Sequence, residues 1–565
     1  MQTDKKKILT GADSFEKIIE GDYFYVDKTL FIKELLENRG EVTLITRPRR
    51  FGKTLNMHML GSFFSIRTPS ATSLFGTGNN NLFDGLKIME HKSIVEKHMH
   101  KYPVIFLTLK NIEESTYTAS IEKFKILIRS LYRQNRYLCD GDKLDEYQME
   151  IYRSLLTGKA NEGELESSLL FLTECLHTYH NKRAIILIDE YDAPISNALM
   201  KGYYEDMIGF MRGFLGGAFK TNNYLEFGVL TGVQRISKEG LVSGFNNPKV
   251  SGIMDREFAT CFGFTDEEVK ASCEMLGMGD KYGEVKEWYD GYRFGGRDMY
   301  NPWSVCGYLD RGVFDNYWVN TGSVKILQDV FNLGDNNLRD EFAGLITGSP
   351  VTMSVEDGIT YPIKYASDNT FWTMLLSVGY IKPCNGAKGD VFNAELVNKE
   401  VRNIFTRYAK EWFGGQNPEV FETILEFVKF LQEGDADAVS GILNNDLLNN
   451  PSCHDFIMEN SYHMFIYGLL YAASGKYTVY SNPEAGKGRS DCVIKPIGKN
   501  GSAVVVEFKH VKRIAPGGME AEAQKALNQI EEKAYIHTLL KEGYKKIFKY
   551  GIAFHKKTCA VAIDK

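Results

Sequence analysis

Three runs of consecutive, mostly apolar residues mark the N-terminal half of the chain: Val42–Thr46, Ala184–Asp189 and Leu225–Gly232. Short apolar runs without alternation are typical of strands buried on both faces of a parallel sheet. A fourth strand is expected at residues 103–107, and segments with helical spacing separate the runs, beginning with residues 15–36. Because strands that alternate with helices predict βαβ units, we expect an α/β domain here.

The rest of the chain divides by pattern into three parts. Residues 256–310 are rich in aromatic residues and glycines and predict a small helical lid. Residues 311–450 predict a helical connector, and the pattern from 475 to 562 reads strand, strand, strand, helix, strand. The expected fold class is therefore α/β multidomain, with boundaries at 1–255, 256–310, 311–450 and 451–565.

Residues 47–54, Arg-Pro-Arg-Arg-Phe-Gly-Lys-Thr, fill the positions of a Walker A loop, G-x-x-x-x-G-K-[ST], between a strand and a helix. The departure is Arg47, which stands where the first glycine is usual. Gly52 would let the backbone approach a phosphate, Lys53 would reach the outer phosphates, and Thr54 would ligate Mg²⁺. The neighbouring Arg49 and Arg50 would either contact phosphate or be solvated. This segment predicts ATP binding.

A second half of the nucleotide site follows the strand that ends at Asp189. Asp189 is expected to hold Mg²⁺ through water, and Glu190 to orient and deprotonate the attacking water. Thr231, at the end of the next strand, is a candidate sensor of the γ-phosphate, and Arg235 a candidate finger. Both are equally compatible with ordinary turn residues.

Near the C-terminus, Asp491 ends a glycine-rich turn, and Glu507 and Lys509 lie two residues apart in an apolar strand. Side chains at i and i+2 share one face of a strand. Two carboxylates and an ammonium on one face predict a divalent-metal site aimed at an anionic substrate. Asp491 and Glu507 are the expected metal ligands, with Lys509 positioning water or stabilising developing charge. The alternatives are a plain ion pair between Glu507 and Lys509, and Glu484 as the acid.

Several motifs together resemble those of the bacterial and archaeal AAA-ATPase-like family, which typically carries a C-terminal PD-(D/E)xK nuclease domain. They are residues 25–29 (Tyr-Val-Asp-Lys-Thr), 47–54, 188–192 (Ile-Asp-Glu-Tyr-Asp), 231–233 (Thr-Gly-Val), 288–292 (Trp-Tyr-Asp-Gly-Tyr) and 300–303 (Tyr-Asn-Pro-Trp). The resemblance spans nearly the whole chain, and Arg47 fits that family's own pattern. It implies a P-loop AAA-like ATPase domain at 1–255 and a nuclease-like domain at 451–565. For Asp27 and the 288–292 motif we expect structural roles.

The nuclease resemblance implies further residues. The backbone carbonyl of Phe508 would complete the metal coordination, and a helical glutamate, Glu459, would add a ligand. Gln529 and Lys533 share a helical face and would contact a phosphate backbone. Tyr535 lies six positions from Gln529, which departs from the Gln-x-x-x-Tyr signature of some superfamily members and leaves the role of this helix open.

Composition is compatible with this assignment. The chain has 565 residues, of which 43% are hydrophobic and 25% charged, as in globular proteins. There is no 18-residue apolar run and no signal-like N-terminus, and nine scattered cysteines suit a reducing compartment, so we expect a cytoplasmic protein. The net charge is −6, yet residues 451–565 hold 17 Lys and Arg against 11 Asp and Glu, a balance compatible with a nucleic-acid partner.

The favoured function is an ATP-regulated nuclease that uses ATP and Mg²⁺, or Mn²⁺ at the nuclease site, and acts on nucleic acid, with DNA as the expected form. One alternative is an NTPase switch whose nuclease-like domain only binds DNA or a protein. Another is an NTPase with a structural C-terminal domain. The sequence leaves open whether the chain forms a homo-oligomer in which an arginine such as Arg235 acts in trans.

Overall fold

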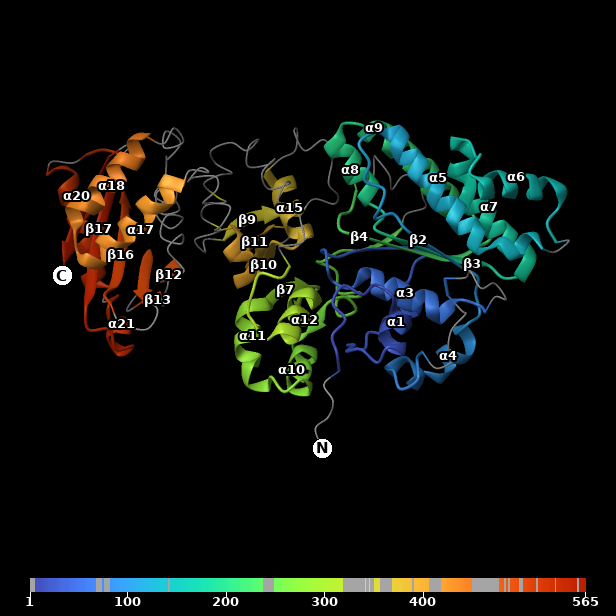
Figure 1. The fold of residues 1–565 in the computed structure, drawn as a ribbon, viewed down its shortest axis with the longest axis horizontal. Coiled ribbons are helices and arrows are strands. Elements are labelled where there is room, and N and C mark those ends of the chain that lie inside the picture. Colours follow the sequence, from blue (N-terminus) through green and yellow to red (C-terminus); the bar gives the residue numbers. More distant parts are fainter. Residues whose placement is uncertain are drawn as a thin grey trace. The chain divides into compact units, whose positions relative to one another are not determined.

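The computed structural model describes residues 6–67, 74–75, 82–140, 143–236, 248–318, 341, 345, 350–355, 368–388, 391–405, 418–449, 477–481, 484–485, 488–496, 501–514, 517–533, 535–555 and 558–564 (Figure 1). The chain forms two compact units. The first comprises Met1–Thr321 and Met353–Lys382, and the second comprises Gly322–Thr352 and Pro383–Lys565. This organisation, with one parallel and one mixed sheet, confirms an α/β multidomain fold.

The first unit is built on a five-stranded sheet of order β2-β3-β4-β1-β5. Its strands are β1 (Val42–Thr46), β2 (Val104–Thr108), β3 (Ala184–Asp189), β4 (Leu225–Gly232) and β5 (Lys249–Ser251). Every neighbouring pair is parallel, so the carboxyl ends of all five strands meet at one edge. β4 lies between β1 and β3, which places its last residues between the ends of the two strands that carry the nucleotide motifs.

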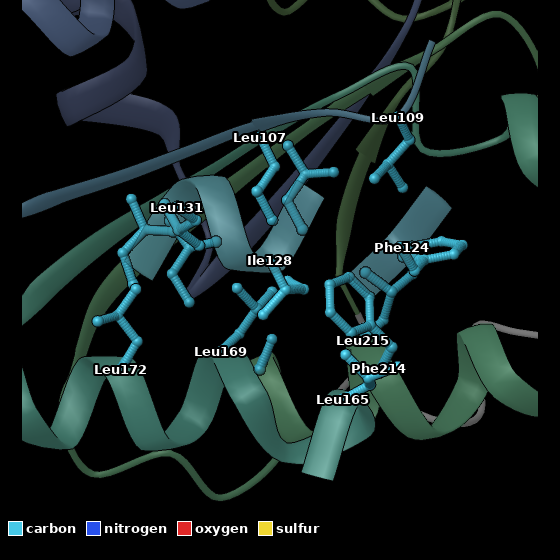
Figure 2. Packing of buried hydrophobic residues seen from close by; sticks show 14 of the residues in the cluster. Leu107, Leu109, Phe124, Ile128, Leu131, Leu165, Leu169, Leu172, Phe214 and Leu215 are labelled. Atoms are coloured by element: carbon cyan, nitrogen blue, oxygen red, sulfur yellow. The ribbon is translucent and has the colours of Figure 1, made fainter. Parts of the chain in front are cut away.

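Helices cover both faces of this sheet (Figure 1). One face carries α5 (Tyr117–Gln134), α6 (Glu146–Thr157), α7 (Glu162–His180), α8 (Ala193–Lys201) and α9 (Tyr204–Phe219); the other carries α1 (Phe15–Glu20), α3 (Lys53–Phe64) and α4 (Lys92–His98). Helix α2 (Leu30–Asn38) precedes β1 in the chain. Figure 2 shows how Leu107 of β2 meets Ile128 of α5, Leu169 of α7 and Phe214 of α9 in one apolar core. Among the described residues, no helix combines the length and apolarity needed to cross a bilayer.

The lid region contains strands as well as helices. α10 (Asp266–Met275), α11 (Tyr282–Tyr289) and α12 (Pro302–Arg311) accompany a sheet of order β6-β8-β7, formed by β6 (Phe264–Thr265), β7 (Asp290–Phe294) and β8 (Arg297–Tyr300). The prediction of a helical lid is therefore incomplete. A tight glycine turn at Gly295 and Gly296, both with positive φ, joins β7 to β8 in a hairpin.

The helical prediction for residues 311–450 also needs correction. It holds for α15 (Asp368–Val378), α17 (Pro418–Glu433) and α18 (Ala436–Asn449), but a sheet of order β10-β11-β9 interrupts them. Its strands are β9 (Val351–Ser354), β10 (Ile381–Lys388) and β11 (Val391–Leu396). β11 alternates buried and less buried residues, the period-2 pattern of a half-buried strand.

The second unit contains a mixed sheet of order β12-β15-β16-β17-β18. Its strands are β12 (Tyr477–Ser481), β15 (Cys492–Pro496), β16 (Ala503–His510), β17 (Ile547–His555) and β18 (Thr558–Asp564). The central pair, β16 and β17, is parallel, and α20 (Gly518–Glu532) and α21 (His537–Lys541) lie in the connection between them. Val504, Val506 and Phe508 of β16 pack with α17 and α18, whereas Val505 packs with α20.

Candidate functional site

The phosphate-binding loop follows β1 and ends where α3 begins at Lys53. Gly52, the residue before the helix, has φ +78°, and a Cβ built there would meet no atom within 4 Å. The left-handed backbone, rather than lack of space, therefore requires glycine at this position. The N-terminus of α3 that follows this turn has N–H groups and a positive dipole end, which are features suited to an anion.

Lys53 is buried at the base of this loop. Its ammonium donates hydrogen bonds to the carbonyl oxygens of Arg47, at 3.0 Å, and Pro48, at 2.9 Å. Burial lowers the pKa of Lys53, and the nearby carboxylates of Glu190 and Asp189 partly oppose that shift. Lys53 is thus a cation held by loop carbonyls, beside the end of the sheet.

Asp189 joins the two halves of the predicted nucleotide site. Its Oδ2 accepts a 2.6 Å hydrogen bond from the hydroxyl of Thr54, and its Oδ1 accepts a 2.5 Å hydrogen bond from the hydroxyl of Thr231. Asp189 and Thr231 are fully buried. The structure therefore brings together three residues that the sequence places on α3, β3 and β4.

Glu190, the next residue, turns away from the strand with φ +54°. A non-glycine residue in this region is uncommon and marks local strain. Burial raises the pKa of Glu190, with a further contribution from the negative charge of Asp189, while Lys53 acts in the opposite direction. A carboxylate with a raised pKa beside a phosphate loop is suited to accepting a proton.

A cavity of about 360 Å³ opens onto this loop and is lined by Lys53, Thr54 and Glu190. Its lining also contains Arg49 and Arg50, both exposed, and the Arg50 guanidinium lies 4.0 Å from the centre of the Trp303 ring. The apolar residues of the lining include Ile8, Leu9, Phe24, Val26, Phe264 and Trp303. The volume falls in the range of small-molecule sites.

Tyr292, Asn301 and Trp318 contact residues of the predicted phosphate loop. The Arg49 carbonyl accepts hydrogen bonds from the Asn301 side chain at 3.3 Å and from the Trp318 indole at 3.2 Å. The ring of Phe51 packs edge-on against Tyr292, with centroids 4.8 Å apart. Tyr292 belongs to the 288–292 motif for which a structural role was expected, whereas Asn301 was singled out only as part of a resemblance.

The turn after β4 is held by the residues that follow Glu190. Asp192 is buried and accepts hydrogen bonds from the N–H groups of Val233 and Gln234, at 3.0 and 2.9 Å. Arg235 lies in this turn, half-buried, and is not one of the described residues that line the cavity. Asp27, for which a structural role was expected, accepts a 2.8 Å hydrogen bond from the N–H of Lys87.

In the second unit, alternation along β16 places Glu507 and Lys509 on the face covered by α20. Glu507 is 4% exposed. It faces Gly551 of β17 in register, and a Cβ at Gly551 would lie 2.2 Å from the carbonyl oxygen of Ala523 in α20. The missing side chain therefore lets the helix backbone approach the sheet directly beside Glu507.

Asp491 and Glu507 are neighbours across the ends of β15 and β16. Asp491 Oδ2 accepts a 2.7 Å hydrogen bond from the N–H of Phe508, and the Asp491 N–H donates to Glu507 Oε2 at 3.4 Å. Burial raises the pKa of Asp491 to about 6. The side-chain amide of Gln529 donates to Glu507 Oε1 and also contacts Tyr535. Gln529 was expected at a phosphate backbone, and the structure instead places it on the candidate metal ligand.

Lys509 forms an ion pair with a glutamate of α20, and the plain ion pair with Glu507 is not the one that the structure shows. Its ammonium lies 3.2 Å from Glu522 Oε2 on α20, and Lys525 lies 2.6 Å from the other oxygen of the same carboxylate. Glu522, whose side chain is 8% exposed, was not identified from the sequence. An i to i+7 relation places Glu522 and Gln529 on one helix face, which is the only sequence signal that relates them.

Glu459, Glu484 and Lys533 are the remaining candidates for this site. Glu459 lies outside the described residues, Glu484 begins the two-residue strand β13 (Glu484–Ala485), and Lys533 is exposed at the end of α20. Within the described residues, no three His, Cys, Asp or Glu side chains converge as a metal site. Asp491 and Glu507 nevertheless fit a divalent cation, since one or two carboxylates with waters and substrate phosphates suffice for Mg²⁺. Thr54 and Asp189 also fit Mg²⁺, because waters and substrate phosphates can complete the coordination around one carboxylate and a hydroxyl group.

Comparison with known proteins identifies two families along the chain. Residues 10–242 match the family described as "Predicted AAA-ATPase", and residues 457–563 match the PD-(D/E)XK nuclease superfamily. A relative from Azotobacter chroococcum mcd 1, "Uncharacterized protein in vnfD 5'region", is 28% identical over 328 residues, 58% of this chain. The alignment covers 56% of that relative, so the chain spans about half of its length. The chain therefore carries an AAA-ATPase-like domain at residues 10–242 and a domain of the PD-(D/E)XK nuclease superfamily at residues 457–563.

Proposed function

We propose that the first unit binds and hydrolyses ATP with Mg²⁺. The observation that carries this proposal is Asp189, which accepts hydrogen bonds from the hydroxyl groups of Thr231 and of Thr54, and Thr54 lines the same cavity as Lys53. In P-loop enzymes the loop Ser or Thr and the strand-end Asp are the two protein groups that hold Mg²⁺. That ion would neutralise charge that develops on the phosphates.

The loop residues bind and orient the triphosphate. The Lys53 ammonium exchanges its hydrogen bonds to loop carbonyls for bonds to the outer phosphates, and the α3 N-terminus contributes N–H donors. Arg49 and Arg50 add positive charge at the cavity mouth. The apolar lining residues Phe24, Val26 and Phe264 have the character needed for a nucleobase.

Glu190 accepts the proton of the attacking water, and Thr231 orients the reacting γ-phosphate through its position next to Asp189. The raised pKa of the Glu190 carboxyl group lies closer to neutral pH, and a general base is most effective when its pKa is near the working pH. Both residues lie at the carboxyl edge of the parallel sheet, where α/β proteins place ligands.

We further propose that the second unit cleaves phosphodiester bonds of nucleic acid, with DNA as the expected substrate. Asp491 and Glu507 would hold a divalent cation, Mg²⁺ or Mn²⁺, which polarises the scissile phosphate and generates hydroxide near neutral pH. The Phe508 N–H and the Gln529 amide hold these carboxylates in place. Lys509 supplies positive charge for the phosphate that becomes more negative in the transition state.

A cleavage assay with plasmid, linear and single-stranded DNA and RNA tests this function. Each substrate is incubated with Mg²⁺ or Mn²⁺, with and without ATP, and wild type is compared with Asp491→Ala. We expect metal-dependent cleavage that is lost in the variant, while ATP turnover is retained. Cleavage by Asp491→Ala at the wild-type rate would show that the metal site is assigned wrongly.

The same assay separates the proposed nuclease from a switch that only binds nucleic acid. A rate that changes with ATP would establish regulation of cleavage by the first unit. No cleavage of any substrate by wild type, together with retained nucleic-acid binding, would favour the switch.

A further inference from the structure

Arg47 occupies the first position of the Walker A motif, and its side chain is fully buried. Nη1 donates to the carbonyl oxygens of Thr46, Ser251 and Gly252 at 2.8, 3.0 and 2.9 Å. Nη2 donates to the Ser251 hydroxyl at 3.4 Å and to the carbonyls of Glu257 and Phe258 at 3.3 and 3.2 Å. All six acceptors are backbone carbonyls or a hydroxyl, an unusual setting for a guanidinium, which more often binds carboxylate or phosphate.

The Arg47 guanidinium is closed off from the nucleotide cavity. The rings of Phe262 and Phe294 lie over it, with centroids 5.7 and 5.3 Å away. Arg49 and Arg50 line the cavity, and Arg47 is not among the described residues that do. Arg47 therefore differs from its two neighbours in having no route to a phosphate in this conformation.

The two nitrogen atoms of the fork join separate parts of the chain. Nη1 donates to backbone carbonyls at the ends of β1 and β5, and Nη2 donates to the carbonyl of Phe258, near the start of the lid region. Phe258 in that segment has φ +56°, and Glu34 Oε1 accepts its N–H at 2.5 Å. A strained, bulky residue persists in such a backbone only when its surroundings fix it on several sides. Three to six residues further on, Cys261 and Phe264 form one wall of the cavity.

We propose that Arg47 is a positioning residue that replaces the first Walker glycine with a buried fork joining the phosphate loop to residues 251–258, the segment just before the cavity-lining residues Cys261 and Phe264. Glycine at position 47 would leave up to five buried or partly buried carbonyls without this donor, a cost that exceeds any gain in backbone freedom. Lysine would keep the charge but could not span both groups of acceptors, because an ammonium has no planar fork. The functional part of this inference rests on ATP binding as proposed above.

Hydrogen exchange on nucleotide-free protein tests the inference independently of ATP binding. Wild type, Arg47→Gly, Arg47→Lys and the control Arg256→Lys are compared over residues 249–258. Arg256 is an exposed arginine of the same segment. We expect protected amides in nucleotide-free wild type and in the control, and at least tenfold faster exchange in both Arg47 variants. If the amides of wild type are protected from exchange only after ATP is added, the proposal is overturned. This comparison uses wild type alone, so it holds even if neither Arg47 variant folds.

A second readout is the Kd for ATP and for ADP. We expect Arg47→Gly, although it restores the usual motif, to weaken both nucleotides by at least tenfold, because the whole loop is displaced. A loss confined to ATP would identify Arg47 as a γ-phosphate ligand and overturn the proposal, as would wild-type affinity in Arg47→Gly. If wild type itself binds no nucleotide, the proposed ATPase function fails, while the exchange result still decides the role of Arg47.

Discussion

Thr54 and Asp189 lie 135 positions apart, and the Thr54 hydroxyl donates a 2.6 Å hydrogen bond to the Asp189 carboxylate. The two halves of the proposed nucleotide site are therefore assembled by the fold itself, through the parallel order of β1, β4 and β3. Preorganisation of this kind lowers the cost of binding, because little has to be ordered when a ligand arrives. The predictions for the first unit follow from this arrangement.

Glu190→Gln should bind ATP as wild type does and hydrolyse it at least about 100-fold more slowly. The amide keeps the size of the side chain but cannot accept a proton from water, and general-base catalysis contributes about 10²–10⁴-fold. Turnover and the Kd for ATP are measured side by side, with the exposed Glu122→Gln of α5 as the control. Turnover at the wild-type rate in Glu190→Gln would refute the assigned base.

Strands β1, β3 and β4 could be predicted from local pattern because they are almost wholly buried on both faces. The bounds of β1, β3 and β4 coincide with the three apolar runs, and α3 begins at Lys53 as the motif implied. β7 and β11 were missed because short strands with one exposed face carry a weak signal, which nearby helical spacing obscured.

The sequence identified the candidate site residues that lie within motifs. It did not identify the residues that hydrogen-bond to them or pair with them in the structure. Glu507 and Lys509 follow from strand alternation, whereas their partners Gln529 and Glu522 depend on how α20 packs on the sheet. Local spacing does not encode that packing. Arg47 was read as a departure from a loop motif, since only the tertiary structure brings β5 and residues 257–258 around its guanidinium.

Gly551→Ala should destabilise the second unit and abolish cleavage. The new Cβ would lie 2.2 Å from the Ala523 carbonyl and 2.4 Å from the Leu527 nitrogen, and both atoms belong to the backbone of α20. The helix must therefore move away from the sheet, at a cost of about 3 kcal/mol. The movement also withdraws Gln529 from Glu507. Thermal unfolding and DNA cleavage are measured on the same preparation.

The matched control for this change is Gly441→Ala in α18. Gly441 is exposed, and its Cβ would meet no atom within 4 Å, so alanine should raise stability by about 1 kcal/mol through its higher helix propensity. Equal effects of the two variants would contradict the close approach of α20 at Gly551.

The pKa of Asp491, raised by burial to about 6, predicts a pH-dependent stability of the second unit. The native state holds this proton more tightly than the unfolded state, whose pKa is near 3.8. The contribution to the free energy of unfolding is therefore fully present below pH 4 and is lost as the pH rises through 6. The total change is about 3 kcal/mol. Subtracting the unfolding profile of Asp491→Asn from that of wild type, both in EDTA, isolates this group.

Divalent metal should reverse that trend, because a cation competes with the proton for the same carboxylate. We expect Mg²⁺ or Mn²⁺ to raise the melting temperature of the second unit more at pH 7.5 than at pH 5.5. Asp491→Asn should show little response at either pH. A metal-induced shift in the variant equal to that of wild type would place the ion elsewhere.

Glu522→Gln should slow cleavage by about 10- to 100-fold with little change in substrate affinity. The carboxylate, nearly buried, holds the Lys509 ammonium at 3.2 Å, and misplacement of a charged group by about 1 Å can cost about 100-fold in rate. The other partner of Glu522 is Lys525, and the Lys525 side chain is 57% exposed. Lys525→Ala should therefore leave the rate within about twofold, as expected for a surface ion pair. A lower kcat at an unchanged KM would assign Glu522 to the placement of Lys509. If both variants instead lose affinity for DNA in equal measure, the three charges form part of the binding surface, and Lys509 acts on substrate binding rather than on the reacting phosphate.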